Sequence, residues 1–288
     1  GFPVSYRHAN KPEAALEDIA LFMQLSEEQP IAIRLCNASG VASADAFHIR
    51  IGHKSTAITL SDILPVLENF GLRVISEHPY QISASDSDSY WLHDFHVITP
   101  DDVQRSDSIS ETFETALINV WKQNAESDLL NALILKAGLD WRQVTMLRAY
   151  SKYMKQLALP YTRPYIADTL AKNVQITQQI CELFSLRFDP AHNANQEQSE
   201  TECKIIEEQI NVALESVENL TEDQILRQYL CLINATLRTN FYQTTDSGQA
   251  INYLSFKFDV HQIPDAPLPK PRFEIYVYSP DFEGVHLR

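Results

Sequence analysis

The segments IAIRLCN (31–37) and FHIRIGH (47–53) alternate apolar and polar residues and so predict two β-strands. In the second segment the large apolar side chains fall on one face, as expected for a strand that packs on a core. Two more strands are predicted at LRVISEHPYQIS (72–83) and YWLHDFHVIT (90–99), joined by the polar hairpin loop ASDSDS (84–89). These four strands decide the fold of the first part of the chain.

Helical spacing surrounds these strands. Asn10 and Glu13 form a capping-box pattern that predicts a helix over about 11–25. A second helix is predicted from Thr59 to Gly71, because glycine commonly ends a helix in a left-handed conformation. The α-β-β-α-β-β order predicts an antiparallel sheet with helices covering one face. This architecture resembles ferredoxin-like and ACT-like regulatory modules, in the same or a permuted order.

From about residue 108 the apolar spacing changes to the helical period of about 3.6 residues. The polar stretch 190–203 is predicted to be a loop or a frayed helix start. Helices are predicted from Ser108 with Glu111, from Asp140 with Gln143, from Thr162 towards Phe184, over about 203–217, and over about 222–238 with a capping box of Thr221 and Gln224.

Two further strands, LSFKFDV (254–260) and RFEIYVYSP (272–280), flank a proline-rich connector. They have no core of their own, so we expect them to pair with the first block or with a domain that follows residue 288. The predicted fold class is therefore α+β. Its parts are an ACT-like or ferredoxin-like α/β sandwich at 1–105, a mainly α-helical domain at 106–245, and a short C-terminal strand pair at 246–288.

Composition narrows the functional classes. The net charge is −15, from 38 acidic against 23 basic residues, which disfavours nucleic acid and anionic membranes as partners. No apolar run approaches the roughly 20 residues of a membrane span, and the amino terminus lacks the pattern of a signal peptide. The 4 cysteines form no CxxC pair, which disfavours a structural zinc site and favours a reducing cytoplasm.

Glycine is scarce and scattered. Only 7 glycines occur, and no two stand close together, so neither GxGxxG nor GxxxxGK[ST] can be drawn. A dinucleotide-binding turn needs closely spaced glycines so that the backbone can approach the pyrophosphate. We therefore predict no cofactor-binding residues within this chain.

Three histidines, His78, His93 and His96, fall on adjacent predicted strands. Positions three apart on a strand face opposite sides, so His93 and His96 should not share one metal ion. DSDS (86–89) lacks the glycine and the closing glutamate of a calcium loop. No GxSxG elbow and no local Cys-His pair occurs, so we predict neither metal ligands nor catalytic residues.

The segment TLRTNFYQ (236–243) places polar residues beside aromatic ones where the helical period stops. It is either a helix C-cap with Asn240 left-handed, or a packing junction in which Arg238 pairs with a carboxylate of another domain. EGVHLR (283–288) stops in mid-pattern, which favours a chain cut from a longer one. The candidate domain-junction residues are Arg238, Asn240, Glu283, His286 and Arg288.

Six segments stand in an order that resembles the large bacterial NAD-specific glutamate dehydrogenases, in the region just upstream of, and entering, the catalytic domain. The resemblance is good over about 110–288 and weaker before that. The segments are AGLDWRQVTMLRAYSKYMKQ (137–156), YIADTL (165–170), LFSLRFDP (183–190), TLRTNFYQ (236–243), LSFKFD (254–259) and FEIYVYSPDFEGVHLR (273–288).

The resemblance implies an oxidoreductase of amino-acid catabolism as the parent chain, which uses NAD to deaminate L-glutamate oxidatively to 2-oxoglutarate and ammonia. It implies a cytoplasmic homo-oligomer under allosteric regulation, whose ACT-like module binds a small-metabolite or amino-acid effector or another subunit. This chain would be a regulatory and scaffolding piece that lacks the active site, with the remainder of its own chain as a partner. The alternative is a stand-alone ACT-like and helical interaction module without enzymatic activity.

Overall fold

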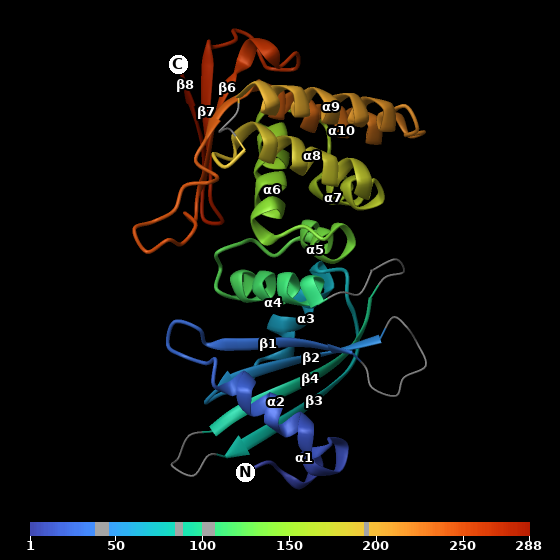
Figure 1. Cartoon of the computed structure of the whole chain (residues 1–288), viewed down its shortest axis with the longest axis vertical. Helices are drawn as coiled ribbons and strands as arrows, with labels where there is room; N and C mark the ends of the chain where they lie inside the picture. Colours follow the sequence, from blue (N-terminus) through green and yellow to red (C-terminus); the bar gives the residue numbers. More distant parts are fainter. Residues whose placement is uncertain (38–45, 84–88, 100–106, 193–195) are drawn as a thin grey trace. The chain divides into compact units, whose positions relative to one another are not determined.

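The computed structural model describes residues 1–37, 46–83, 89–99, 107–192 and 196–288 (Figure 1). Contacts between residues divide the chain into two compact units. The first combines Gly1–Gln123 with Ser127–Trp141, and the second combines Asn124–Glu126 with Arg142–Arg288. The domain boundaries expected after 105 and 245 stay predictions, because a division by contacts does not mark the domains of a parent chain.

The first unit is built on a four-stranded antiparallel sheet with the order β1-β2-β4-β3. All four strands lie where alternation predicts them. The strands are β1 (Ile31–Asn37), β2 (Ala46–Lys54), β3 (Arg73–Ser83) and β4 (Ser89–Ile98). The helical segments are α1 (Val4–Ala9), α2 (Pro12–Phe22), α3 (Leu60–Asn69), α4 (Asp107–Trp121), the 3₁₀ turn η1 (Leu129–Asn131) and α5 (Ala132–Ala137).

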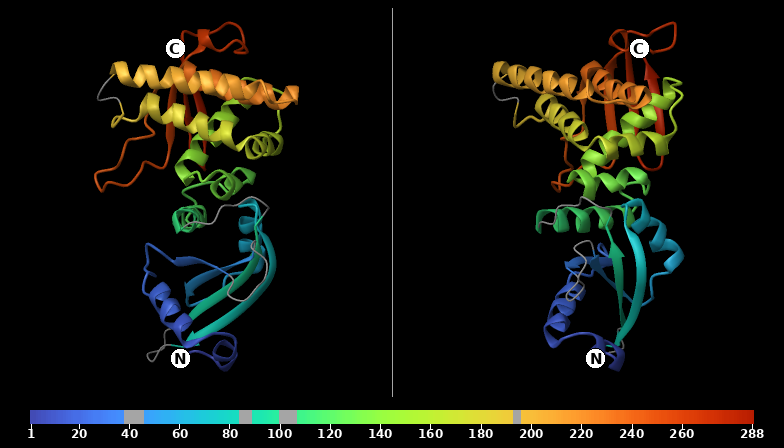
Figure 2. Two further views of the ribbon diagram at one scale, coloured as in Figure 1. Left: turned by 45° about the vertical axis from the view of Figure 1, so that its right-hand side comes forward. Right: turned by 90° about the vertical axis from the view of Figure 1, so that its right-hand side faces the viewer.

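Helices cover both faces of this sheet, so the expectation of one covered face is wrong (Figure 2). Helix α2 packs on the face of Gly52, where a Cβ would come within 3.2 Å of the Phe22 ring. Helix α3 lies on the opposite face, beside strand β3. The strands bury apolar side chains on both faces, among them Ile33 on one and Ala32 on the other, and each face needs its own cover.

The start of α2 is predicted correctly, but its cap is not. Lys11 occupies the N-cap position and makes no side-chain capping bond. The side chain of Asn10 instead donates to the carbonyl of Tyr6 and accepts a hydrogen bond from Arg50. A tertiary contact with a charged partner thus replaces the local capping bond.

The second unit contains five long helices and a second sheet. The prediction of one helix from Thr162 towards Phe184 is wrong, because Asn173 takes a non-helical conformation and separates two helices. The stretch predicted as a loop or frayed start is helical from residue 196. The helices are α6 (Trp141–Gln156), α7 (Arg163–Lys172), α8 (Val174–Phe188), α9 (Gln196–Leu214) and α10 (Leu220–Ala235).

Helix caps in this unit are mixed. Thr162 caps α7 as predicted, accepting from the backbone N–H of Tyr165. Asn219, and not Thr221, caps α10, because the Asn219 side chain accepts from two backbone N–H groups of the first turn.

The expectation that the two C-terminal strands pair with the first block or with a domain after residue 288 is wrong, because they pair with each other inside a four-stranded antiparallel sheet, β5-β6-β7-β8. TLRT (236–239), expected at the end of a helix, is an edge strand, and EGVHL (283–287) is the other edge. The α+β fold class is confirmed, with a larger C-terminal sheet than the predicted pair. The elements are β5 (Thr236–Thr239), β6 (Leu254–Asp259), the 3₁₀ turn η2 (Val260–Gln262), β7 (Phe273–Tyr278) and β8 (Glu283–Leu287).

Aromatic side chains join this sheet to the helices beside it. The ring of Tyr153 on α6 stacks on Phe258 at 4.3 Å between centroids and lies 5.2 Å from Tyr276. Tyr150 lies 4.8 Å from Phe256. All of these rings are buried, so the strands share a core with α6 and are part of the helical unit.

Candidate functional site

One face of the first sheet divides into an apolar half and a charged half. Helices α1 and α2 cover the apolar half, with Tyr6 and Leu21 packed against Leu92. The next row across the four strands is charged, because Arg34, Arg50, Asp94 and His78 are paired in register. A pocket of about 500 Å³ opens over this row. It is lined by Ala9, Asn10, Lys11, Glu13, Ala14, Glu17, Arg34, Cys36, His48, Arg50, His78, Tyr80 and Asp94.

Asp18 of α2 binds two arginines of the charged row. Its side chain is fully buried, and it accepts hydrogen bonds from the Tyr6 hydroxyl at 2.5 Å and from Arg34 Nη2 at 2.8 Å. Arg50 Nη1 donates to Oδ2 of Asp18, the oxygen that also accepts from Tyr6, whereas Arg34 donates to Oδ1. Burial raises the pKa of Asp18, and the Tyr6 hydroxyl and the Arg50 guanidinium oppose that shift. Two arginines are thereby held in fixed positions at the pocket floor.

Arg50 connects this anchor to the opposite strand. Its Nη2 atom lies 3.5 Å from Asp94 Oδ2 and also donates to the side-chain oxygen of Asn10. Asp94 in turn lies 2.8 Å from Nδ1 of His48. Burial alone would lower the pKa of Arg50, but the carboxylates of Asp18 and Asp94 raise it, so the guanidinium keeps its charge.

The pocket wall carries both signs of charge in equal number. Its cations are Lys11, Arg34 and Arg50, and its carboxylates are Glu13, Glu17 and Asp94. A polyanion such as a nucleotide would meet the carboxylates at short range, which is unfavourable in a partly buried site. A small molecule with separated positive and negative groups could pair with both sets. The arrangement therefore favours a zwitterion or a polar metabolite.

The three strand histidines do not converge. His78 lines the pocket, whereas His93 lies on the opposite face, where its Nδ1 is 2.8 Å from Glu77 and its Nε2 accepts from the Ile58 N–H. In the described ranges, no group of three or more His, Cys, Asp or Glu residues could hold a metal ion. The DSDS segment lies outside the described residues except for Ser89.

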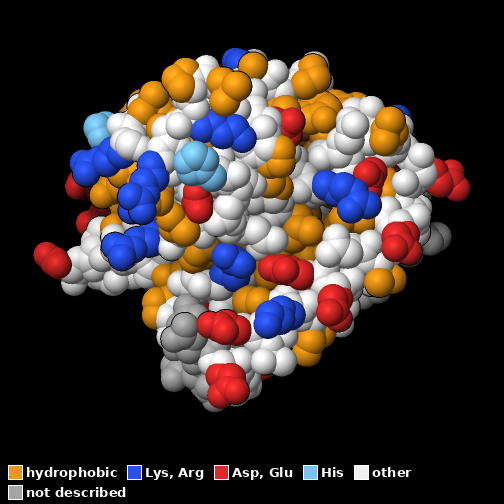
Figure 3. Space-filling view, turned by 90° about the horizontal axis from the view of Figure 1, so that it is seen from above, with side chains coloured by type: hydrophobic (Ala, Val, Ile, Leu, Met, Phe, Trp, Pro, Cys, Tyr) orange, Lys and Arg blue, Asp and Glu red, His pale blue; other side chains and the backbone are white. Residues whose placement is uncertain are grey.

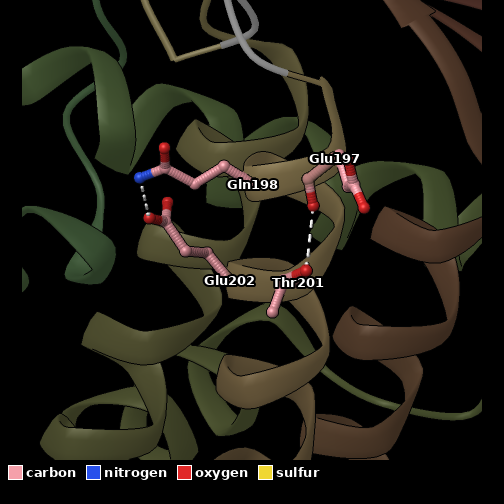
Figure 4. Close-up of a pocket in the computed structure, with 4 residues that line it drawn as sticks. All are labelled: Glu197, Gln198, Thr201 and Glu202. Carbon is pink, nitrogen blue, oxygen red and sulfur yellow. Dashed lines mark hydrogen bonds between the residues drawn. The ribbon is translucent and has the colours of Figure 1, made fainter.

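A second hollow lies on the surface of α9 (Figure 4). Its lining side chains all come from one stretch of that helix and satisfy one another. Gln198 donates to Glu202 at 2.8 Å, and the Thr201 hydroxyl donates to the backbone carbonyl of Glu197 at 2.9 Å. Among the described residues, no second element supplies a group to this hollow, so they offer no convergent chemistry there.

The five junction candidates all lie on or directly after the two edge strands of the C-terminal sheet, β5 and β8. The Asn240 side chain accepts from the Ser255 N–H at 2.7 Å and so closes the mouth of the β5–β6 hairpin. The expected left-handed helix cap at Asn240 is wrong, since α10 ends at Ala235 and Asn240 has no positive φ. Glu283 accepts from the Tyr276 hydroxyl at 2.9 Å. Their role at a domain junction, like that of Arg238, His286 and Arg288, stays a prediction.

The pocket residues were missed by the sequence analysis, although a signal was present. The signal is Asp18, which stands on the otherwise apolar stripe of the helix at 12–22. A charged residue at a core position needs a partner, so it indicates a polar site. Arg34 and Arg50 alternate with the large apolar residues of their strands, at positions where a charged side chain is ordinary, and they give no such signal.

The described residues contain no glycine-rich turn of the kind that holds a dinucleotide pyrophosphate. The described glycines with positive φ, Gly71, Gly138 and Gly248, each stand alone, at a helix end or in a turn, so they form no glycine-rich strand-to-helix turn. In the part of the chain that the structure describes, no helix is both long enough and apolar enough to cross a membrane.

Three protein-family models match successive parts of the chain. "Glutamate dehydrogenase, ACT3 domain" matches residues 30–109, and "Glutamate dehydrogenase, helical motif 3" matches residues 125–190. "Bacterial NAD-glutamate dehydrogenase, catalytic domain" matches residues 209–288. The α/β block thus coincides with an ACT match, and the C-terminal sheet lies within a catalytic-domain match.

Curated relatives named NAD-specific glutamate dehydrogenase match the whole chain. The protein of Halomonas elongata is 42% identical over 291 residues, and that of Pseudomonas aeruginosa is 40% identical over 292. The protein of Mycobacterium tuberculosis is 31% identical over 295 residues. In each case the match covers 100% of this chain but only 18% of the relative, so the chain spans less than a fifth of their length. The chain is therefore similar, from end to end, to one segment of the bacterial NAD-specific glutamate dehydrogenases, a segment that runs from an ACT3 domain into the catalytic domain.

Proposed function

We propose that this chain is a regulatory and scaffolding segment of an NAD-dependent glutamate dehydrogenase. The complete enzyme would convert L-glutamate, NAD and water to 2-oxoglutarate, ammonia and NADH. One observation carries the proposal, namely the succession of ACT3, helical-motif and catalytic-domain matches along a chain that spans 18% of its relatives. In this arrangement the helical unit braces the sheet at 236–287, which belongs to the catalytic part.

The segment by itself should lack activity, because its scattered glycines provide no dinucleotide turn. The test is to mix the purified 288-residue chain with L-glutamate and NAD and to follow NADH by absorbance. The full-length parent protein serves as the positive control. We expect turnover from the parent and none from the segment. NADH production by the segment would contradict the prediction that the segment is inactive. A parent protein without turnover would contradict the proposal that the parent is a glutamate dehydrogenase.

A stand-alone ACT-like and helical interaction module is the rival function. The reading frame distinguishes the two, because a stop codon directly after Arg288 would favour the module. Continuation of the frame into a glycine-rich segment would exclude it.

We further propose that the pocket between α2 and the first sheet binds the effector that regulates the enzyme. The support is the pocket volume of about 500 Å³, within the range typical of small-ligand sites, and its equal numbers of cations and carboxylates. The preferred effector would be a zwitterionic amino acid. Subunit contact is the other role that an ACT-like module can have in the expected homo-oligomer.

Thermal unfolding in the presence of single amino acids, dicarboxylates and nucleotides tests this proposal. A ligand at 100 times its Kd stabilises the folded state by about 2.7 kcal/mol, which is measurable. We expect a zwitterion to raise the unfolding temperature and nucleotides to leave it unchanged. His78→Ala changes an exposed lining residue and should reduce the shift, whereas Arg73→Gln, on the same strand but outside the pocket, should not. If no compound gives a shift, the effector role is wrong.

The cysteines indicate the cellular compartment of the enzyme. None of the four cysteines is in a disulfide bond. Thiols outside disulfide bonds are typical of a reducing compartment, so we place the enzyme in the cytoplasm.

A further inference from the structure

The outer face of the C-terminal sheet, which points away from the helices, carries a row of basic side chains. The register pairs Arg238 with Lys257, Lys257 with Ile275, and Ile275 with His286. The neighbouring positions on β6, such as Phe258, are buried against the helices, so the side chains of this row point to the other side. Arg288 continues the face, because its backbone pairs with that of Phe273.

Aromatic contacts hold these cations close together. Lys257 Nζ lies 4.2 Å from the centre of the Phe273 ring, and the Arg272 guanidinium lies 5.2 Å from the same centre. Arg288 Nε donates to Nε2 of His286 at 3.1 Å. Figure 3, a view onto the end of the unit that carries the C-terminus, shows lysine and arginine side chains near histidine and apolar side chains, with acidic side chains among them.

No Asp or Glu side chain forms an ion pair with the cations of this face within the described part of the chain. None of the ion pairs found there involves Arg238, Lys257, Arg272 or Arg288. The acidic residue among the outward positions, Asp259, is engaged elsewhere, because its carboxylate accepts from the backbone N–H of His261 and from the Gln262 side chain. A chain with a net charge of −15 has thus collected unpaired cations on one surface.

The same face is also apolar, which distinguishes it from a merely solvated charged surface. Phe273, Ile275 and Val277 are only partly buried, although they stand in the middle of the sheet. All five residues of the edge strand β8 are exposed, so its outer backbone groups are open to pairing. Apolar residues interspersed with arginine, beside an open edge, are typical of a protein interface.

We propose that this outer face, defined by Arg238, Lys257, Arg272, Phe273, Ile275 and Arg288, docks a carboxylate-bearing surface of the parent polypeptide that lies outside these 288 residues. Charge complementarity favours an acidic occupant. The apolar centre of the face favours a protein surface over a small anion. The relatives are more than five times longer than this chain, and the whole sheet lies within the catalytic-domain match, so the parent supplies ample surface. The inference rests on the proposed function in that it needs a longer parent.

Hydrogen exchange of the full-length parent, compared with that of the 288-residue chain, tests the docking. We expect amides of β6 to β8 to exchange roughly tenfold more slowly in the parent. In the parent, the double variant Arg238→Glu/Arg272→Glu should lose this protection. The control variant Lys155→Glu/Lys204→Glu reverses two exposed charges elsewhere in the same unit and should keep it. Unfolding midpoints of both variants in the 288-residue chain should match the unsubstituted chain.

Other outcomes of the exchange experiment would contradict the docking or assign the face to another occupant. Equal exchange in the parent and in this chain would overturn the docking. Protection that appears in this chain alone as its concentration rises would assign the face to a second copy. Protection by sulfate or by duplex DNA alone would assign it to a small anion or to nucleic acid. A parent that oxidises glutamate without protecting the face contradicts only the docking, whereas a parent without glutamate turnover contradicts the proposed function.

Discussion

The hydroxyl of Tyr153 donates a hydrogen bond to Oε2 of Glu274 at 2.5 Å, across 121 residues of sequence. Tyr153 is fully buried and Glu274 is 7% exposed, so water cannot replace either partner. Burial and the hydrogen bond to the Glu274 carboxylate raise the pKa of Tyr153, so that the hydroxyl remains a donor at neutral pH. This bond ties strand β7 to helix α6 and fixes the C-terminal sheet on the helical unit.

Tyr153→Phe should lower the free energy of unfolding by about 1–3 kcal/mol, because it leaves a buried carboxylate without its donor. Urea unfolding of the 288-residue chain measures the loss. Tyr161→Phe is the matched control, since its hydroxyl makes an exposed bond of 3.3 Å to Gln224, and its effect should stay within about 0.5 kcal/mol. If both variants lower the free energy of unfolding by the same amount, the buried hydrogen bond contributes no more to stability than the exposed one.

Asp18→Asn should be more damaging, at about 3–5 kcal/mol, because it removes the charge that pairs with two arginines at the pocket floor. Glu17→Gln removes a neighbouring carboxylate that is 63% exposed and should cost less than about 0.5 kcal/mol. Denaturant unfolding compares the two. If Asp18→Asn unfolds like the control, the network does not stabilise the fold.

Much of the first sheet could be predicted from the sequence, because strand alternation is a local signal. The Arg34 and Arg50 positions followed from the same alternation, but their meeting at one pocket required the strand register, which no local pattern provides. The break at Asn173 depends on a tertiary contact, since its side chain donates to the backbone of Thr169 and to Glu222 on another helix. Periodicity alone continued the helix through that residue.

The two inner strands of the C-terminal sheet were predicted, but strand β5 was not, for a related reason. TLRT follows α10 without a turn residue, and only its pairing with β6 makes it a strand. Its four residues are too few to show an alternation, and the β-bulge between Thr236 and Arg238 disrupts what alternation remains. The sheet is therefore defined by long-range pairing that the chain sequence leaves open.

Glu114 should make stability depend on pH in an unusual direction. Burial raises its pKa above the ordinary value of 4.5, although it accepts a hydrogen bond from the Leu35 N–H at 2.8 Å. The folded state therefore keeps the proton at a pH where the unfolded chain has lost it. The stabilising contribution is complete below pH 4.5 and is lost as the pH rises through the raised value.

Glu114→Gln keeps an oxygen acceptor for the Leu35 N–H and removes this titration. Relative to the unsubstituted chain, the variant should gain stability as the pH rises from about 4 to 7. Urea unfolding at several pH values tests this, with Glu68→Gln, an exposed carboxylate on α3, as the control. A difference between Glu114→Gln and the unsubstituted chain that does not change with pH would contradict the expectation.

Asn240 should control the opening of the β5–β6 hairpin. Its side chain accepts from the Ser255 N–H at 2.7 Å and donates to the Tyr253 carbonyl at 3.2 Å. Residues 243–250 of the loop are exposed, and Arg142 joins the two ends of the loop by donating to the carbonyls of Phe241 and Ile251. Asn240 therefore shares the closure of the hairpin with Arg142. Asn240→Ala should lower the free energy of unfolding by about 1–2 kcal/mol.

The sharper measurement is local, because the Ser255 amide has Asn240 as its side-chain acceptor. Its hydrogen exchange should become faster in Asn240→Ala, while amides of α6 keep their rates. Ser247→Ala in the exposed turn of the same loop removes a hydroxyl contact with Thr245 and should leave Ser255 unaffected. If the Ser255 amide exchanges at the same rate in both variants, the Asn240 side chain does not protect it. A role of Asn240 at the domain junction would then be the remaining explanation for this residue.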